Sequence, residues 1–375
     1  MMERRKNLND KFGFVDLMKI KDFIDYELPN EYIVESDRYS NGCSTPVLTA
    51  GQSFILGYTN ESKGIYKKGP CIIFDDFTTS VHYVDFPFKV KSSAMKILTI
   101  KSNADLKYCY YLLLSLSKMP PNHKRQWIST TSEKNHVLPS MDRQISIVKQ
   151  LDLISDTIVN YTNQIENLDN LVKARFVEMF GNPATPGDKF KTCKLGEVAD
   201  VKSSHRVFST EFVNEGVPFY RGTEISVLAS GQQPEDPYRI SMDHYLKIAN
   251  DDSKPIRGDL LLPSICNKGQ VWMVNTDEPF YYKDGRVLCI SPHRSIFDSR
   301  YLQFYMKMRT EAEYPKLGSG STFAEFKIFQ LKELLVDMPP MNAQKSFCLF
   351  ADQVDKSRFD IKKSIIELER EVVYD

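Results

Sequence analysis

The chain has 375 residues, 42% of them hydrophobic and 26% charged, and its formal net charge at pH 7 is zero. This composition is that of an ordinary globular protein with room for two or three domains, and it gives no overall attraction to nucleic acid. The sequence has no apolar run of 18 residues, no basic segment leading into an apolar one at its start, and no C-x-x-C pair among its seven cysteines. We therefore expect a cytoplasmic chain with free thiols, without membrane insertion, secretion or a zinc site.

The first 137 residues have the pattern of a mostly β block. Short apolar or alternating stretches predict strands at 45–51, 71–74, 81–90 and 95–100. A buried helix is predicted at 105–117. Asp75 and Asp76 follow the most apolar of these strands, and a role in a turn is favoured for them over an acidic site. Basic residues are slightly in excess over residues 1–138 and nowhere else in the chain.

A long amphipathic helix is predicted next, between Leu138 and Pro183. Apolar side chains recur in alternating steps of four and three residues, the spacing that keeps one seam toward a partner helix. The seam consists of Ile147, Leu151, Ile154, Ile158, Tyr161, Ile165, Leu168 and Val172. A helix over residues 141–180 would be about 60 Å long, too long for one small domain. We therefore expect the flanking blocks near its opposite ends.

Residues 184–337 repeat the order of the first block with little identity. Residues 217–222, 258–262, 287–290 and 298–301 correspond in order to 45–51, 69–74, 97–100 and 105–108. The shared order and diverged side chains predict one fold that serves two different specificities.

A second long helix is predicted from Met338 to the last residue, Asp375. It opens as the first does, because Met338-Pro339-Pro340-Met341 with Gln344 corresponds to Leu138-Pro139-Ser140-Met141 with Gln144. Its seam has the same register, at Phe347, Ala351, Val354, Arg358, Ile361, Ile365, Leu368 and Val372. Arg358 is the one residue that does not fit, and it either extends out of the seam or pairs with an acidic neighbour.

These elements predict an α+β fold made by internal duplication. Two mostly β globular domains are separated by long helices that pair as an antiparallel coiled coil with a pseudo-two-fold axis. The alternative is that each apolar stripe packs on the core of its own block. The predicted divisions are 1–137 for the first domain, 138–183 for the central helix, 184–337 for the second domain and 338–375 for the C-terminal helix.

Four segments, taken in order, resemble the specificity (S) subunits of type I restriction-modification systems. They are Pro46-Val47-Leu48-Thr49-Ala50-Gly51, Ile73-Phe74-Asp75-Asp76-Phe77-Thr78-Thr79, the helix end from Leu171 to Gly181, and Leu317-Gly318-Ser319-Gly320-Ser321-Thr322-Phe323. The resemblance covers essentially the whole chain and rests on the order of the segments across two repeats. One departure is that the first block has no Gly-Ser-Gly-Ser-Thr segment before Leu138.

The resemblance implies that each block is a target-recognition domain that reads one half of a bipartite, asymmetric sequence in double-stranded DNA. It also implies that the helices set the gap between the halves and dock methyltransferase subunits, and it leaves open whether restriction subunits bind as well. S-adenosylmethionine, ATP and Mg are then expected on partner subunits, with no cofactor on this chain. The alternative function is a protein-interaction scaffold with two heads on a coiled-coil spacer.

Basic and polar side chains on loops are the candidates for contact with DNA, because they can reach base edges or phosphates. For each of them the alternative is a solvated surface group. The candidates are Lys63, Lys67, Lys68, Lys89, Lys91, Arg125 and Trp127 in the first block, and Arg206, Arg221, Lys254, Lys268, Arg286, Ser319, Ser321 and Thr322 in the second.

Catalytic patterns are weak in this chain. Glu325-Phe326-Lys327 fits the E-x-K half of a nuclease site, but no clear partner aspartate precedes it. Glycine-rich nucleotide loops are absent, and the six histidines show no metal-ligand spacing. We therefore expect a non-catalytic chain without a metal site.

Overall fold

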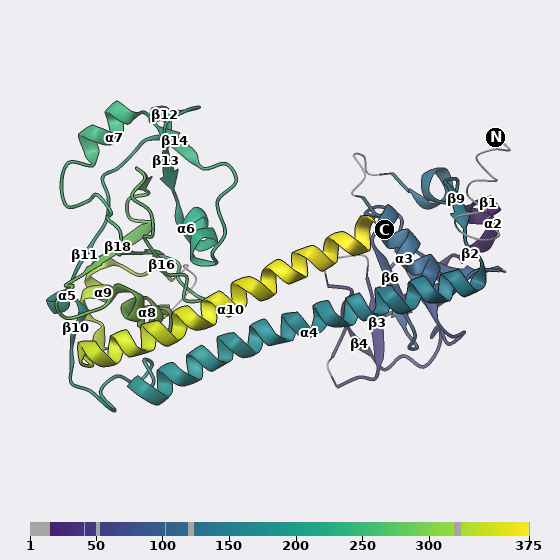
Figure 1. Cartoon of the computed structure of the whole chain (residues 1–375), viewed down its shortest axis with the longest axis horizontal. Coiled ribbons are helices and arrows are strands. Elements are labelled where there is room, and N and C mark those ends of the chain that lie inside the picture. Colours follow the sequence, from purple (N-terminus) through teal and green to yellow (C-terminus); the bar gives the residue numbers. More distant parts are fainter. Residues whose placement is uncertain are drawn as a thin grey trace. The chain divides into compact units, whose positions relative to one another are not determined.

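The computed structural model describes residues 16–40, 42–49, 53–101, 103–118, 124–318 and 324–374, and its chain divides into two compact units (Figure 1). The first unit comprises residues 1–163 and 362–375, and the second comprises residues 164–361. Both divisions fall within the long helices α4 (Met141–Phe180) and α10 (Met341–Tyr374). The domain boundaries expected from the sequence stay a prediction.

Two sheets form the globular part of the first unit, which we call the first head. The larger is antiparallel with the order β2-β8-β5-β6. Its strands are β2 (Ile24–Glu27), β8 (Met95–Ile100), β5 (Cys71–Asp75) and β6 (Val81–Val84). The smaller sheet has the order β4-β3-β7, with β3 parallel to β7. Its strands are β4 (Ile55–Thr59), β3 (Thr45–Leu48) and β7 (Lys89–Val90).

A buried central strand explains the apolar run in the first head. Successive side chains of a strand point to opposite faces, and β5 is buried at every position. Ile72 and Phe74 pack with α3 (Leu106–Leu116), whereas Cys71 and Ile73 pack with the smaller sheet. The remaining elements are β1 (Asp16–Lys19), α2 (Ile20–Phe23), a 3₁₀ turn (Pro29–Tyr32), a π-helical turn (Trp127–Thr131) and β9 (Asn135–Leu138), which pairs with β1.

The second unit contains a head whose sheets follow the same strand order as the first, with one added edge strand, β12. Its larger sheet has the order β11-β18-β15-β16 and its smaller sheet the order β12-β14-β13-β17, again with one parallel pair, β13 with β17. The strands are β11 (Ala199–Lys202), β18 (Val287–Pro292), β15 (Leu260–Pro263), β16 (Trp272–Met273), β12 (Phe212–Val213), β14 (Tyr238–Ile240), β13 (Val217–Tyr220) and β17 (Tyr281–Tyr282). The predicted α+β fold and internal duplication are confirmed.

The helices of the second head include two insertions, α6 and α7. The helix α8 (Ser299–Glu313) packs on the larger sheet as α3 does in the first head, and α5 (Leu195–Val198) corresponds to α2. In chain order, the helix α6 (Gly222–Ala229) follows β13 and precedes β14, whereas in the first head β3 ends at Leu48 and β4 already begins at Ile55. The helix α7 (Met242–Ile248) follows β14 and precedes β15, and the residues between β4 and β5 of the first head contain no helix. The other elements are β10 (Thr192–Lys194), 3₁₀ turns (Ser209–Glu211, Tyr314–Lys316), α9 (Ile328–Glu333) and β19 (Leu335–Asp337), which pairs with β10.

The seam residues of the long helices are buried or partly buried wherever the structure describes their side chains. In the second unit, Leu168 and Val172 of α4 share one core with Phe347, Ala351 and Val354 of α10. The same core includes α8 and the larger sheet. In this unit the two long helices therefore pair with each other and also pack on the core of the head. In the first unit, Ile147 packs on the core of its own head.

Arg358 pairs with acidic neighbours, as one of its two expected roles required. It forms ion pairs with Asp169 of α4 and with Asp355 of its own helix. A cation in an otherwise apolar seam is thereby compensated within the second unit.

A buried glutamine joins each head to its long helix in the same way. The side chain of Gln144 accepts a hydrogen bond from the backbone N of Asp105 at 2.8 Å and donates to the carbonyls of Asn103 (3.1 Å) and Pro139 (2.8 Å). Both the amide oxygen and the amide nitrogen thus have partners, and the side chain has no exposed surface.

The second glutamine repeats this pattern bond for bond. Gln344 accepts from the backbone N of Asp298 at 2.8 Å and donates to the carbonyls of Ile296 (2.9 Å) and Pro339 (2.8 Å). Asp105 and Asp298 are themselves the N-caps of α3 and α8. Each glutamine therefore fixes the start of a head helix against the start of a long helix.

The seven cysteines are free, as expected from the sequence. Burial raises the pKa of the Cys71 and Cys109 thiols to about 12. Such thiols stay protonated and unreactive at neutral pH. In the part of the chain that is described, none of the helices combines the length and hydropathy that crossing a membrane requires.

Replacing the buried glutamine tests its role. We expect Gln344→Leu to destabilise the protein by about 1–3 kcal/mol, because it leaves a buried N–H and two carbonyls without partners. Gln353→Leu on the exposed side of the same helix is the matched control and should change stability by less than about 0.5 kcal/mol. Thermal and urea unfolding of the full chain measure both, and equal shifts for the two variants would contradict the role.

Candidate nucleic-acid interface

At one end of the sheets, equivalent backbone hydrogen bonds join the loops in both heads. In the first head, the backbone N of Lys91 donates to Leu48 O at 2.8 Å, that of Asp76 to Ala94 O at 3.1 Å, and that of Gln126 to Asp76 O at 2.8 Å. These bonds hold together the end of β3, the end of β5, the β7–β8 turn and the segment before the π-helical turn. We call residues 48–49, 75–79, 91–94 and 124–127 the loop end of the first head.

The second head has three equivalent bonds. Lys283 N donates to Tyr220 O at 2.9 Å, Ser264 N to Arg286 O at 2.9 Å, and Phe326 N to Ser264 O at 2.8 Å. Residues 206, 220–224, 263–266, 283–286 and 324–327 form the loop end of the second head. The two loop ends thus share a backbone frame, while the side chains that they present differ.

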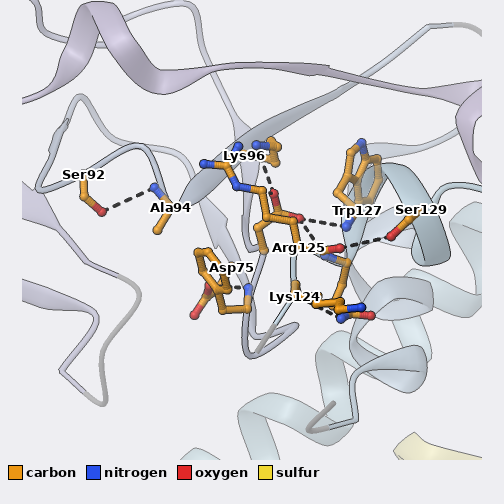
Figure 2. Close-up of polar contacts among 11 residues, drawn as sticks. Asp75, Ser92, Ala94, Lys96, Lys124, Arg125, Trp127 and Ser129 are labelled. Carbon is orange, nitrogen blue, oxygen red and sulfur yellow. Dashed lines mark hydrogen bonds and ion pairs between the residues drawn. The ribbon is translucent and has the colours of Figure 1, made fainter. Parts of the chain in front are cut away.

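A buried carboxylate organises the loop end of the first head (Figure 2). Asp76 Oδ1 accepts from the backbone N of Trp127 at 2.8 Å and from that of Gln126 at 3.0 Å. Its Oδ2 lies 3.1 Å from Lys96 Nζ, and both side chains are only 1% exposed. The Oδ2 atom makes no hydrogen bond of good geometry to a described residue, so the Lys96 charge is its main compensation.

The neighbouring carboxylate has a separate, local role. Asp75 Oδ1 accepts from the backbone N of Phe77 at 2.9 Å, and Oδ2 accepts from the Thr78 hydroxyl at 2.5 Å. Such bonds to residues two and three positions ahead define a turn. The predicted turn role is therefore confirmed for the Asp75 side chain, whereas the Asp76 carboxylate contacts Gln126, Trp127 and Lys96 instead.

Two predicted DNA contacts in the first head are corrected. Lys89 is 2% exposed. Its Nζ pairs with Glu61 Oε2 at 2.8 Å and donates to Lys63 O at 2.7 Å, so it is held by the segment that contains these two residues. Trp127 is 1% exposed and packs edge-on against Phe74. Neither side chain can reach a ligand from these positions.

The other basic candidates of the first head are on its surface, but they are not all in one place. Lys91 and Arg125 lie at the loop end, where Lys91 pairs with Asp37 and Arg125 Nε is 4.0 Å from Asp76 Oδ2. Figure 2 shows the Arg125 side chain beside that of Lys96. Lys63, Lys67 and Lys68 are exposed outside the loop end, and Lys68 pairs with Glu27 at 2.7 Å.

Three predicted arginines gather at the loop end of the second head. Arg206 Nε pairs with Asp284 Oδ2 at 3.1 Å, Arg221 Nη2 with Glu224 Oε1 at 2.7 Å, and Arg286 with Glu325. The Cβ position of Gly222 is 3.7 Å from Arg286 O, which places the start of α6 beside the β17–β18 turn. These three predicted residues therefore share one surface.

The structure adds two lysines to this surface. Lys283 occupies the position that Lys91 has in the first head, and Lys327 pairs with Glu325 at 2.9 Å. The repeat order was the signal that would have found Lys283. Lys254 and Lys268 are exposed outside the loop end, whereas Ser319, Ser321 and Thr322 lie outside the described residues.

The E-x-K triplet is explained by ion pairing. Glu325 accepts from Lys327 and Arg286, and the hydrogen bond from Lys327 holds the pKa of the carboxyl below its usual value. In the described ranges, no group of three His, Cys, Asp or Glu side chains is arranged to hold a metal ion.

Comparison with known proteins shows which proteins this chain is similar to. The profile of the family described as "Type I restriction modification DNA specificity domain" matches residues 187–370. Over 171 residues the chain is 41% identical to the specificity subunit of the type I restriction enzyme EcoR124I/EcoR124II of Escherichia coli, covering 43% of this chain and 42% of that protein. The chain is thus similar to specificity subunits of type I restriction-modification systems, and the family match lies in its second half.

More distant relatives extend over more of the chain. A putative type I restriction enzyme MjaX specificity subunit of Methanocaldococcus jannaschii is 22% identical over 291 residues, covering 70% of this chain and 64% of that protein. Both curated relatives are thus matched over less than two thirds of their own length.

Two solved structures share the fold. The S subunit of a type I restriction-modification system from M. genitalium has a TM-score of 0.54 at 15% identity, covering 97% of this chain and 95% of that one. A chain from a structural study of complex assembly and conformational transition of the type I R-M system has a TM-score of 0.52 at 17% identity, covering 93% and 94%.

The buried ion pair of the first loop end can be tested by substitution. We expect Lys96→Met to destabilise the protein by about 3–5 kcal/mol, because the Asp76 carboxylate is left buried without its countercharge. Adding Asp76→Asn should recover part of that loss, since the charge that lacked a partner is removed. Lys67→Met on the surface is the control. Urea unfolding gives the free energies, and a double variant no more stable than Lys96→Met would refute the pairing.

Proposed function

We propose that the chain is the DNA-reading, non-catalytic specificity subunit of a type I restriction-modification complex. Each head reads one half of a bipartite, asymmetric site in double-stranded DNA. The long helices set the gap between the halves and dock methyltransferase subunits, and restriction subunits join the same complex. S-adenosylmethionine, ATP and Mg belong to those partners, which carry out the methylation and cleavage.

One observation supports this proposal above the others: the two loop ends share a backbone frame and differ in their side chains. An asymmetric bipartite target requires two readers of similar shape and different chemistry. The first loop end presents Lys91 and Arg125, and the second presents Arg206, Arg221 and Arg286. Loops fixed by a rigid sheet can carry such side chains to base edges without losing further conformational freedom on binding.

The charge distribution fits a reader that depends on local contacts. The net charge of the chain is zero, so affinity for a polyanion must come from the cations gathered at the loop ends. Each bidentate contact to a base edge is worth about 1–3 kcal/mol of discrimination. Selectivity then arises from a few side chains, while phosphate contacts supply the salt-dependent part of the affinity.

A protein-interaction scaffold is the alternative function, and DNA binding separates the two. The assembled complex should bind duplex DNA with sequence selectivity and with an affinity that falls as salt rises, by a slope of about −0.9 per phosphate contact on a log-log plot. A scaffold would show neither the selectivity nor this slope.

Methylation mapping in the host tests the proposal directly. We expect deletion of the gene to abolish adenine methylation at one interrupted, asymmetric motif, because the methyltransferase loses its means of locating that motif. Single-molecule sequencing of the genome with and without the gene measures this, and reintroducing the wild-type gene is the control. An unchanged methylome in cells with an active partner methyltransferase would favour the scaffold.

Lengthening both helices tests their role as a spacer. We expect seven residues inserted between Leu151 and Ile165, and seven between Ala351 and Ile365, to lengthen the gap by about 10 Å, or roughly three base pairs. A heptad keeps the seam in phase, so neither half of the motif should change. The methylated motif reports both properties. Altered half-site sequences would contradict the spacer role, and insertion in one helix alone should disrupt pairing.

A further inference from the structure

One arginine at the loop end of the second head is held in a fixed orientation. The guanidinium of Arg221 donates from Nε to Glu224 Oε2 at 3.1 Å and from Nη2 to Glu224 Oε1 at 2.7 Å. Glu224 itself is fixed, because its Oε2 also accepts from the backbone N of Arg221 at 2.8 Å and from the Thr223 hydroxyl at 3.0 Å. Arg221 is 44% exposed, whereas Glu224 is 9% exposed.

A stack of aromatic rings fixes the plane of the same guanidinium. Its Cζ lies 4.5 Å from the centre of the Tyr238 ring, and that ring stacks on Phe212 with centres 4.6 Å apart and planes 9° from parallel. A guanidinium over the face of a tyrosine is stabilised electrostatically. Glu224 and Tyr238 together determine both the direction and the tilt of the group before any ligand arrives.

One edge of the Arg221 guanidinium makes no contact with Glu224. The carboxylate takes the side edge, which consists of Nε and one hydrogen of Nη2. The end edge, formed by Nη1 and the other hydrogen of Nη2, takes no part in that pair. Two parallel N–H donors on this edge match two neighbouring acceptors in one plane.

Arg221 differs from the other arginines of this surface. Arg206 and Arg286 also have carboxylate partners, but their partners Asp284 and Glu325 are 20% and 18% exposed, and within the described residues neither arginine stacks on a ring. The equivalent backbone hydrogen bonds place Thr49 at the corresponding position of the first head, where β4 already begins at Ile55 and leaves no room for a helix as long as α6. The arrangement is therefore specific to the second head.

We propose that Arg221 reads a guanine in the half-site of the second head, donating from its end edge to N7 and O6 in the major groove. The inference rests on the proposed function and goes beyond it by naming a base and the side chain that selects it. Guanine is the base that offers two adjacent acceptors in the major groove. Adenine places an amino group where O6 would be, and cytosine and thymine lack the N7 acceptor.

The support that Glu224 and Tyr238 give to the guanidinium, which we call the buttress, favours a base over a phosphate as the ligand. A phosphate also accepts from an arginine fork, but its tetrahedral oxygens place little demand on the plane of the guanidinium, and a lysine serves it as a point charge. A base edge is planar and needs the tilt that Tyr238 imposes. Replacing arginine by lysine therefore separates the two ligands, because it keeps the charge and removes the planar fork.

The test uses the purified complex of the full chain with its methyltransferase subunits. Wild type and variants select from duplexes randomised across both half-sites, and sequencing gives the base preference at each position. We expect wild type to require guanine at one position of one half-site. Arg221→Lys should reduce the preference there by about five- to 150-fold, and should leave the other half-site and the salt dependence of binding unchanged.

Two further variants sharpen the result. Glu224→Gln retains the shape of the buttress but removes its charge, and it should weaken the same guanine preference without touching any other position. Arg257→Lys is the matched control, because Arg257 holds Asp277 with the same two nitrogens at the opposite end of β15, and it should change no preference. Unfolding midpoints equal to that of wild type establish that each variant is folded.

The failures of the two proposals look different. If wild type shows no sequence preference, the proposed function fails and this inference fails with it. If wild type is selective but Arg221→Lys keeps every preference, the guanine assignment alone is overturned. Uniform weakening of all sequences by Arg221→Lys would assign the residue to phosphate and would also overturn it.

Discussion

A single buried amide side chain determines how each head meets its helix. Gln144 and Gln344 have partners for both oxygen and nitrogen, and those partners belong to the turn before the long helix and to the segment that caps the head helix. A rotation at this joint would leave several buried polar groups without partners, which costs far more than a single surface contact gains. Each head is therefore fixed against the first turn of its own long helix.

Scaffold and chemistry are separated within each head. Three backbone hydrogen bonds define the loop end and place no demand on side chains, so the residues at these positions are free to differ. The first head uses that freedom to bury an ion pair between Asp76 and Lys96. The second inserts α6 and places an ion-paired arginine at its start. Two different surfaces on one frame are the result.

The sequence predicts those features that repeat with a period. The seam register, the duplicated order of strands and the equivalence of Gln144 and Gln344 in the repeat can all be found because each feature appears twice in the sequence. The burial of Lys89 and Lys96 cannot be found in this way, since it depends on Glu61 and Asp76, which lie 28 and 20 positions away and are brought close only by the fold. Trp127 is hidden for a similar reason, because a distant carboxylate anchors its backbone. The sequence predicts each candidate arginine of the second head by itself, but only the sheet topology shows that the three lie on one surface.

Most cations at the loop ends already have a carboxylate partner, among them Lys91 with Asp37, Arg206 with Asp284 and Arg286 with Glu325. For a reader of DNA, contact with a phosphate then exchanges one ion pair for another, and the net gain is small. Under the proposed function, random sequence would be held weakly and released quickly, while a matching site would add contacts that no internal carboxylate can offer. The internal partners would then shorten the dwell time on wrong sequences, and the complex would spend more of its time moving between sites.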